Sequence, residues 1–90
     1  MRVVEITDQY TPIAGRTLAE LGADVVVVEP VEGSPHRHRP PFVDDERDAN
    51  RSLRWWAGNV GKRSVTIDLN TEVGIDKLRE LIATADVVLA

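Results

Sequence analysis

The amino-acid sequence predicts an α/β domain built on a parallel sheet. Two runs, VVEI at 3–6 and DVVVVE at 24–29, are short and consist mainly of adjacent β-branched residues. Such runs are typical of strands that are covered on both faces in a parallel sheet. A helical pattern lies between them, and strand and helix alternate again after residue 63. This alternation favours a Rossmann-like, three-layer arrangement with helices on both faces of the sheet.

The first half of the chain reads as a β-α-β unit. After the strand at 3–6, Thr11 and Pro12 supply a helix N-cap and a first-turn proline. We predict a helix over 12–21 that ends at Gly22 and lines one face with an apolar stripe of Ile13, Thr17, Leu18 and Leu21. The strand at 24–29 follows, and its apolar character places it at the centre of the sheet.

Residues 30–50 show no periodic pattern and are predicted to form a loop. They contain four prolines, the run HRHRPP and the charged string DDERD. Loops longer than about 12–15 residues in compact domains are usually functional or disordered. The following SLRWWA at 52–57 predicts a short helix that turns Leu53 and Trp56 to the core, and of the neighbours Trp55 and Trp56 one is expected inside and one on the surface.

The second half predicts a strand, a helix and a further strand. SVTIDL at 64–69 alternates, with Val65, Ile67 and Leu69 on one face. Asn70 and Thr71 cap a helix whose apolar residues keep helical spacing, namely Ile75, Leu78, Leu81 and Ile82. ADVVLA at 85–90 is a fourth strand with no helix after it, so we expect an apparently truncated sheet in which residues 1–90 are the N-terminal domain of a longer chain.

Composition excludes several classes of partner. The net charge of −4 and the pI of about 5.0 give no basic footprint for nucleic acid or for an anionic membrane. No apolar run approaches the ~20 residues of a membrane span, and the chain has no cysteine for disulfides, thiol chemistry or zinc. We therefore expect a cytoplasmic protein without nucleic-acid or membrane partners.

Familiar nucleotide motifs fail on spacing. In GNVGKRSVT at 58–66, the glycines are three apart, Arg63 separates Lys62 from Ser64, and a strand rather than a helix follows, so it is no phosphate-binding loop. The turn TDQYTP lacks the glycine fingerprint of NAD and FAD domains. Without that fingerprint, Glu29 is interpreted as a solvated carboxylate at a strand end, and Lys62-Arg63 as a solvated turn.

No metal site or acid–base pair is readable. His36 and His38 are spaced i, i+2 beside two arginines, which disfavours a divalent ion, so no metal is expected. Ligands of doubly wound sheets bind beyond the carboxyl ends of the strands, which here are 7–11, 29–33 and 68–71. The residues alone thus predict an anionic-ligand site at this edge.

Four blocks of sequence, in order, resemble the class III CoA-transferases, the group of formyl-CoA and carnitine-CoA transferases that also includes the α-methylacyl-CoA racemases. The blocks are VVEI with YTPIAGRTLAELGADVVVVEP, then GSPHR, then NVGKRSVTIDLNTEVG, then LRELIATADVVLA. They resemble the family patterns A-G-P…L-G-A-D-V-I-K-V-E-P, G-D-P-x-R, N-x-x-K-R-S-x-x-L-D-L-K-T-x-x-G and A-D-V-x-x-E-N-F. The set is specific in this order, and it implies that the K-R-S stretch leads into a strand whose end helps to hold CoA.

The resemblance implies a set of CoA-binding residues at the three strand ends: Gln9 and Tyr10; Pro30; and Ile67, Asp68, Leu69 and Asn70. The chain departs from the family patterns at four positions. Thr11 stands for glycine, Val27 for lysine, Ser34 for aspartate and Asn70 for lysine. Two lysines expected near phosphate are therefore absent.

The resemblance further implies an enzyme that transfers CoA between carboxylic acids through an aspartyl-CoA intermediate. CoA is a substrate, no cofactor is expected, and the full-length protein is expected to be a homodimer. The nucleophilic aspartate lies beyond the E-N-F motif, so no catalytic residue is expected in residues 1–90, and this part alone should be inactive. Two alternatives stay open: a racemase that uses the same CoA pocket, and a nucleotide-binding or interaction module without catalysis. The sequence downstream of Ala90 would separate them.

Overall fold

The computed structural model describes residues 1–6 and 12–89. These residues form a four-stranded parallel sheet in the order β3-β2-β1-β4, as the sequence predicts. The strands are β1 (Arg2–Ile6), β2 (Asp24–Glu29), β3 (Arg63–Thr66) and β4 (Val87–Leu89). β1 and β2 lie at the centre, with Val4 paired to Val26 on one side and to Val88 on the other. The two valine-rich runs are thus the buried middle of the sheet.

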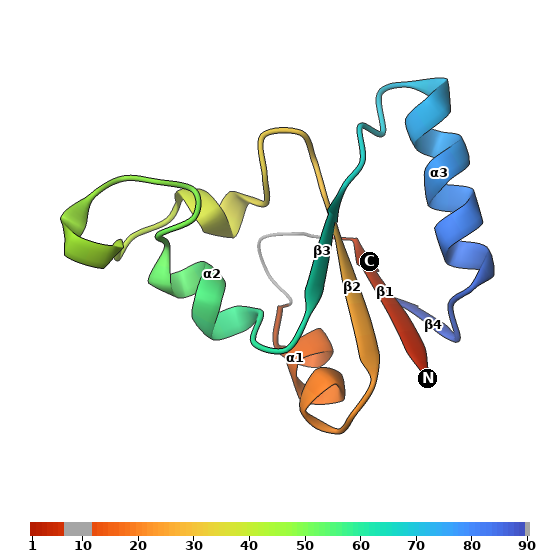
Figure 1. Ribbon diagram of the computed structural model, residues 1–90, viewed down its shortest axis with the longest axis horizontal. Helices are drawn as coiled ribbons and strands as arrows, with labels where there is room; N and C mark the ends of the chain where they lie inside the picture. The colour runs from red at the N-terminus through yellow and green to blue at the C-terminus, as the bar shows by residue number, and fades with distance from the viewer. Residues whose placement is uncertain (7–11, 90) are drawn as a thin grey trace.

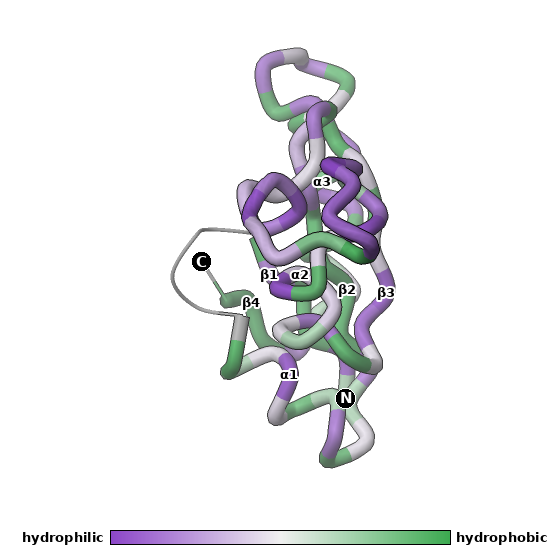
Figure 2. The backbone as a smooth tube through the Cα atoms, turned by 90° about the vertical axis from the view of Figure 1, so that its left-hand side faces the viewer, coloured by the Kyte–Doolittle hydropathy of each residue, from purple (hydrophilic) through white to green (hydrophobic). Residues whose placement is uncertain are grey.

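Helices cover both faces of the sheet, which gives the predicted three layers. Figure 1 views the sheet nearly edge-on, with α3 (Glu72–Ala83) on one side and α2 (Leu53–Gly58) on the other. α1 (Pro12–Glu20) lies on the α2 side, where Arg16 Nη1 donates to the Ala57 carbonyl at 2.8 Å. Figure 2 shows the hydrophobic stretches in β1 and β2, whereas α3 carries much hydrophilic sequence.

The core on the α3 side is small and apolar. Val4, Val28 and Ile67 form its buried centre, and Leu78, Leu81 and Ile82 of α3 pack against it, as their spacing predicts. β3 ends at Thr66 rather than at residue 69, because only residues 63–66 pair with β2. Ile67 is buried, but Val65 and Leu69 stay partly exposed since β3 forms an edge of the described sheet.

The two short helices are rotated relative to the sequence prediction. α1 ends before Gly22 as expected, but Ile13 and Leu21 are 71% and 78% exposed, because α1 meets the sheet through Gly15 instead. A Cβ on Gly15 would lie 2.1 Å from Glu5 Oε1. In α2, Trp55 is 8% exposed and Trp56 is 48% exposed. One tryptophan is inside as predicted, but it is Trp55, and the prediction that Leu53 and Trp56 face the core was wrong.

The predicted loop at 30–50 is an ordered arm in the structure. It contains the 3₁₀ helices η1 (Pro35–His38) and η2 (Val43–Asp45), and an antiparallel bridge joins Phe42 to Ser52. The Ser52 hydroxyl oxygen lies 2.8 Å from the His36 carbonyl oxygen and 2.7 Å from that of Arg39, so these two carbonyls share its one proton, and it also accepts from the Trp55 amide as the N-cap of α2. This capping fixes which tryptophan turns inward. No helix among the described residues has the length and apolar character to cross a membrane.

Candidate functional site

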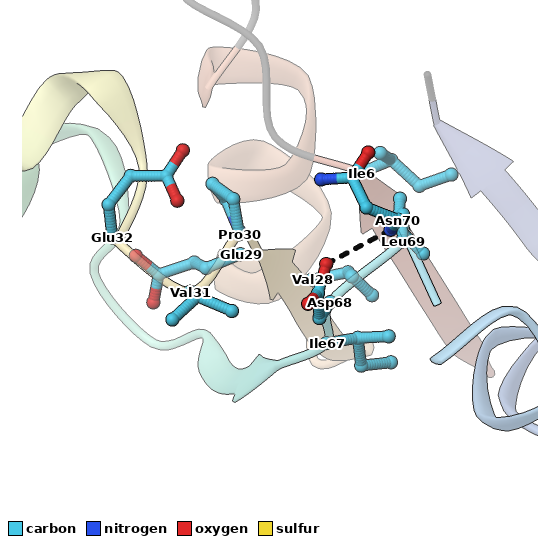
Figure 3. A pocket seen from close by; sticks show the side chains of 10 residues that line it. All are labelled: Ile6, Val28, Glu29, Pro30, Val31, Glu32, Ile67, Asp68, Leu69 and Asn70. Atoms are coloured by element: carbon cyan, nitrogen blue, oxygen red, sulfur yellow. Dashed lines mark hydrogen bonds between the residues drawn. The ribbon is translucent and has the colours of Figure 1, made fainter. Parts of the chain in front are cut away.

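A cavity of about 410 Å³ lies beyond the carboxyl ends of β1, β2 and the segment after β3 (Figure 3). It is lined by Ile6, Val28, Glu29, Pro30, Val31, Glu32, Ile67, Asp68, Leu69 and Asn70. Five of the predicted CoA-binding residues are in this set: Pro30, Ile67, Asp68, Leu69 and Asn70. The other two, Gln9 and Tyr10, lie outside the described residues. The structure therefore brings two distant segments of the prediction together at one cavity, and their contact with CoA stays a prediction.

One wall of the cavity is the turn that connects β3 to α3. Asp68 organises this turn, because its carboxylate accepts from the Asn70 amide at 3.0 Å and its carbonyl accepts from the Thr71 hydroxyl at 2.9 Å. Thr71 in turn caps α3 by accepting from the Gly74 amide at 3.0 Å. Gly74 sits so close that a Cβ on it would lie 1.8 Å from the Asp68 carbonyl oxygen. The turn and the first turn of α3 therefore form one tightly packed unit.

The opposite wall is the turn at residues 30–33. The Gly33 amide donates to the Pro30 carbonyl at 2.9 Å, which closes the turn directly after β2. The nearby His38 ring nitrogen Nε2 lies 2.9 Å from the Glu32 carbonyl oxygen, which ties the turn to η1. Pro30, Val31 and Glu32 thus reach the cavity from a constrained piece of backbone.

The cavity is lined by both apolar and acidic side chains. Ile6, Val28 and Ile67 supply the apolar surface, while the acidic members are Glu29, Glu32 and Asp68. None of the described residues that line the cavity is a lysine or an arginine. Among the described residues, a phosphate placed here would therefore depend on backbone N–H groups rather than on a cationic side chain. Apolar surface with hydrogen-bond acceptors suits a neutral group that carries hydroxyl or amine donors.

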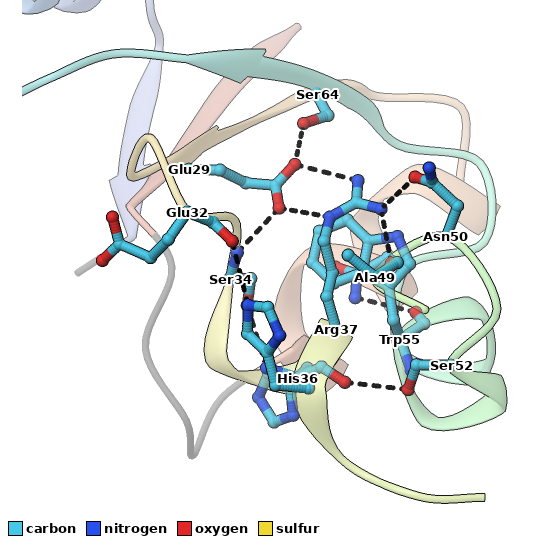
Figure 4. A network of polar contacts seen from close by, with 12 residues as sticks. Glu29, Glu32, Ser34, His36, Arg37, Ala49, Asn50, Ser52, Trp55 and Ser64 are labelled. Atoms are coloured by element: carbon cyan, nitrogen blue, oxygen red, sulfur yellow. Dashed lines mark hydrogen bonds and ion pairs between the residues drawn. The ribbon is translucent and has the colours of Figure 1, made fainter. Parts of the chain in front are cut away.

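Glu29 is not the solvated carboxylate that the sequence suggested. Glu29 is only 3% exposed. Its carboxylate oxygen Oε1 accepts from the Ser34 amide at 2.9 Å and from Arg37 Nε at 2.5 Å. Oε2 accepts from Arg37 Nη2 at 3.0 Å and from the Ser64 hydroxyl (Figure 4). Burial raises the pKa of the Glu29 carboxyl, but the hydrogen bonds from Arg37, Ser64 and Ser34 outweigh it and hold the pKa below its ordinary value.

Lys62 is also not in a solvated turn. Its side chain is 1% exposed, and Nζ lies 3.0 Å from both carboxylate oxygens of Glu5 and 2.8 Å from Asn59 Oδ1. This buried ion pair joins the segment before β3 to Glu5, near the carboxyl end of β1, beneath Gly15 of α1. Arg63, the next residue, pairs instead with Asp24 near the surface at 2.7 Å.

Sequence reasoning missed these two buried pairs, although both carboxylates show the same signal in the sequence. Each carboxylate lies in an otherwise buried valine run, Glu5 within VVEI and Glu29 at the end of DVVVVE. A charge in such a run is expected to have a partner, since unpaired buried charges are costly. Within the described residues, no group of three or more His, Cys, Asp or Glu side chains is placed to hold a metal ion.

Comparison with known proteins decides the family. The family model of CoA-transferase family III matches residues 1–90. The chain belongs to CoA-transferase family III. Among curated members, the succinate–glutarate CoA-transferase of Agrobacterium fabrum is 42% identical, over 99% of this chain and 23% of its own length. The BbsE subunit of succinyl-CoA:(R)-benzylsuccinate CoA-transferase from Thauera aromatica is 35% identical, over 98% of this chain and 22% of its own.

Solved structures of the family share this fold. A CAIB/BAIF family protein from Brucella suis superimposes with a TM-score of 0.84 and 44% identity, covering 98% of this chain and 24% of that protein. The chain thus spans about a quarter of the length of the family III relatives it matches. A 2-methylfumaryl-CoA isomerase from Chloroflexus aurantiacus also matches, at 41% identity over 79% of this chain and 17% of its own length.

Proposed function

We propose that residues 1–90 are the N-terminal, CoA-binding domain of an enzyme that transfers CoA between carboxylic acids. The observation that supports it best is the convergence of Pro30 and residues 67–70 on one cavity at the carboxyl edge of the sheet. In α/β sheets this edge is where ligands bind. CoA enters as a substrate, and the domain itself uses no cofactor.

The role of these residues in the proposed reaction is to bind CoA. The cavity holds part of the CoA so that the acyl thioester reaches an aspartate outside residues 1–90. The aspartate carboxylate displaces CoA thiolate to give a mixed anhydride, and the thiolate then attacks the aspartyl carbonyl, releases the free carboxylic acid and forms the aspartyl-CoA intermediate. No residue of 1–90 is assigned a bond-making role.

The test uses the full-length protein with succinyl-CoA as donor, because several relatives carry succinate or succinyl-CoA in their names. A panel of carboxylic acids serves as acceptors, and mass spectrometry follows the products. A new acyl-CoA that forms only when both donor and acceptor are present supports the transferase. Absence of any new acyl-CoA across the panel would contradict it.

An isomerase or racemase is the second candidate, and the 2-methylfumaryl-CoA isomerase relative favours it. Such an enzyme would rearrange one acyl-CoA without an acceptor acid, so an acceptor-free incubation separates it from the transferase. A CoA-binding module without catalysis would bind CoA and show neither reaction. Residues 1–90 expressed alone should show neither reaction in any case.

We further propose that the full-length protein is a cytoplasmic homodimer. The family resemblance supports the dimer, and the lack of cysteine suits a reducing compartment. Light scattering of the purified full-length protein measures the mass directly, and a monomeric mass at micromolar concentration would contradict the dimer. Cell fractionation tests the location.

A further inference from the structure

Glu29 has no free acceptor position for a ligand. A carboxylate can accept about four hydrogen bonds, and the Glu29 oxygens already take four, from Ser34, Ser64 and twice from Arg37 (Figure 4). Although Glu29 borders the cavity, its oxygens are used within the protein. Its contribution to a bound ligand must therefore pass through the groups that it holds.

Arg37 connects this carboxylate to the arm and to α2. Its guanidinium lies over the Trp55 ring, 4.0 Å from the ring centre. Its Nη1 also donates to the Ala49 carbonyl at 3.2 Å and to Asn50 Oδ1 at 3.3 Å. Since Arg37 is mostly buried and its fork is bidentate to Glu29, the pair is geometrically specific as well as strong.

Glu29 and Ser34 stand at the two ends of the turn that forms the cavity wall. The carboxylate of Glu29 accepts from the Ser34 amide, so it closes the segment between them into a ring. Residues 30–32, which lie inside that ring, all line the cavity. The Ser64 hydroxyl fastens the same carboxylate to β3. A single buried group thus sets where the wall lies relative to the sheet.

We propose that Glu29 is a positioning residue for the CoA site: through Ser34 and Arg37, its carboxylate holds residues 30–32 in place as a wall of the cavity. This inference rests on the proposed CoA binding. It predicts that disturbing Glu29 changes how well CoA binds without changing the chemical step, because the Glu29 oxygens are bonded within the protein and act on the ligand only through the wall. Supporting groups of this kind normally fix the geometry of the residues that touch the ligand.

The decisive variant is Glu29→Gln in the full-length protein. Glutamine keeps the shape, but its amide nitrogen cannot accept a hydrogen bond. In one orientation of the amide, this nitrogen faces the Arg37 and Ser64 donors, and in the other it faces the Arg37 and Ser34 donors. We expect the KM for the acyl-CoA donor to rise about tenfold, since loss of contact worth about one hydrogen bond to the ligand weakens binding by about that factor. The kcat should stay within about twofold of the wild type, as expected when only binding is lost.

Two further variants serve as control and as second test. Asp24→Asn removes a carboxylate from the other end of β2, where it pairs with Arg63 and Arg2 and does not line the cavity, so the KM should not change. Arg37→Lys keeps the charge but loses the bidentate fork and the stacking on Trp55. It should raise the KM as Glu29→Gln does, and the double variant should show the same rise rather than the product of the two.

Calorimetric titration of CoA into the wild type separates the possible failures. If the wild type does not bind CoA, the proposed function fails and this inference fails with it. If the wild type binds CoA and the folded Glu29→Gln variant has an unchanged KM, the positioning role alone is overturned. An equal loss of kcat in Glu29→Gln would also overturn it, since that would indicate general damage. Should Glu29→Gln not fold, Arg37→Lys decides by the same criteria.

Discussion

Asn70 lies exposed at the cavity, one residue before the N-cap of α3, where the family pattern has lysine. We predict that Asn70→Lys in the full-length protein tightens CoA binding by about 0.5–1 kcal/mol, the scale of a partly exposed charge interaction. The lysine would attract phosphate, and it would also offset the negative charge of Glu32 and Asp68 in the cavity lining.

Calorimetric titration of CoA at low and high salt checks this prediction. The gain should shrink at high salt, because attraction between exposed charges is screened over about 10 Å at 0.1 M. Asn70→Gln is the matched control and should bind like the wild type. Equal affinity of the lysine variant and the wild type at both salt concentrations would place the phosphates elsewhere.

Because Lys62 is buried, we predict that its substitution lowers the free energy of unfolding by a large amount. Lys62→Met removes the cation from the buried Glu5 carboxylate, and breaking a buried pair in this way costs about 3–5 kcal/mol. The neighbouring Arg63→Met breaks an exposed pair with Asp24 and should cost much less. Urea unfolding of both variants in the full-length protein measures the difference, and equal costs would contradict the buried pair.

The lowered pKa of Glu29 predicts that the protein loses stability in acid. Because its pKa lies below the ordinary 4.5, it stabilises the fold fully above that pH, and this contribution disappears as the pH falls through the lower folded value. The difference in thermal midpoint between the wild type and Glu29→Gln should therefore be constant from neutral pH down to the ordinary pKa, and should narrow as the pH falls further. A difference that is the same across the whole range would contradict the lowered pKa.

At the scale of elements, the junction between α3 and the turn before it decides the shape of the site. Gly74 permits the closest approach, since a Cβ there would meet the Asp68 carbonyl at 1.8 Å. We predict that Gly74→Ala destabilises the protein by about 1–3 kcal/mol, the usual cost of overpacking, and that it weakens CoA binding by moving the turn. Val73→Ala, in the same helical turn but largely exposed, is the control.

Unfolding curves and CoA titrations of the two variants provide the measurement. Gly74→Ala should lose both stability and affinity, whereas Val73→Ala should lose little of either. Wild-type affinity in Gly74→Ala would mean that the turn at Asp68 does not touch CoA.

The elements that sequence predicts well are those whose signals are local. β1 and β2 are visible as valine runs, and α3 is visible from its Thr71 cap and from the spacing of Leu78, Leu81 and Ile82. The rotation of α1 and α2 is not local, because an apolar stripe says which residues are hydrophobic but not which of them meets the sheet. Contacts with other segments of the chain, made by Gly15 in α1 and by Ser52 at the start of α2, determine that choice.

At the scale of the molecule, the site followed from topology and the buried charges did not. The rule that ligands bind at the carboxyl ends of parallel strands, with the family resemblance, brought Pro30 and Asp68 to one cavity. The pair of Lys62 and Glu5 joins positions 57 apart in the sequence. The valine run around Glu5 indicates that this carboxylate needs a partner, but no local pattern identifies the partner as Lys62. The order of the strands had to be known first.

The central claim is that this cavity at the carboxyl edge of the sheet binds CoA. A crystal structure of the full-length protein with CoA tests it most directly. We predict that bound CoA lies against the turn at residues 30–32 and against Asp68 and Asn70, with the Glu29–Arg37 pair intact behind the turn. CoA bound at another edge, with this cavity empty, would contradict the account.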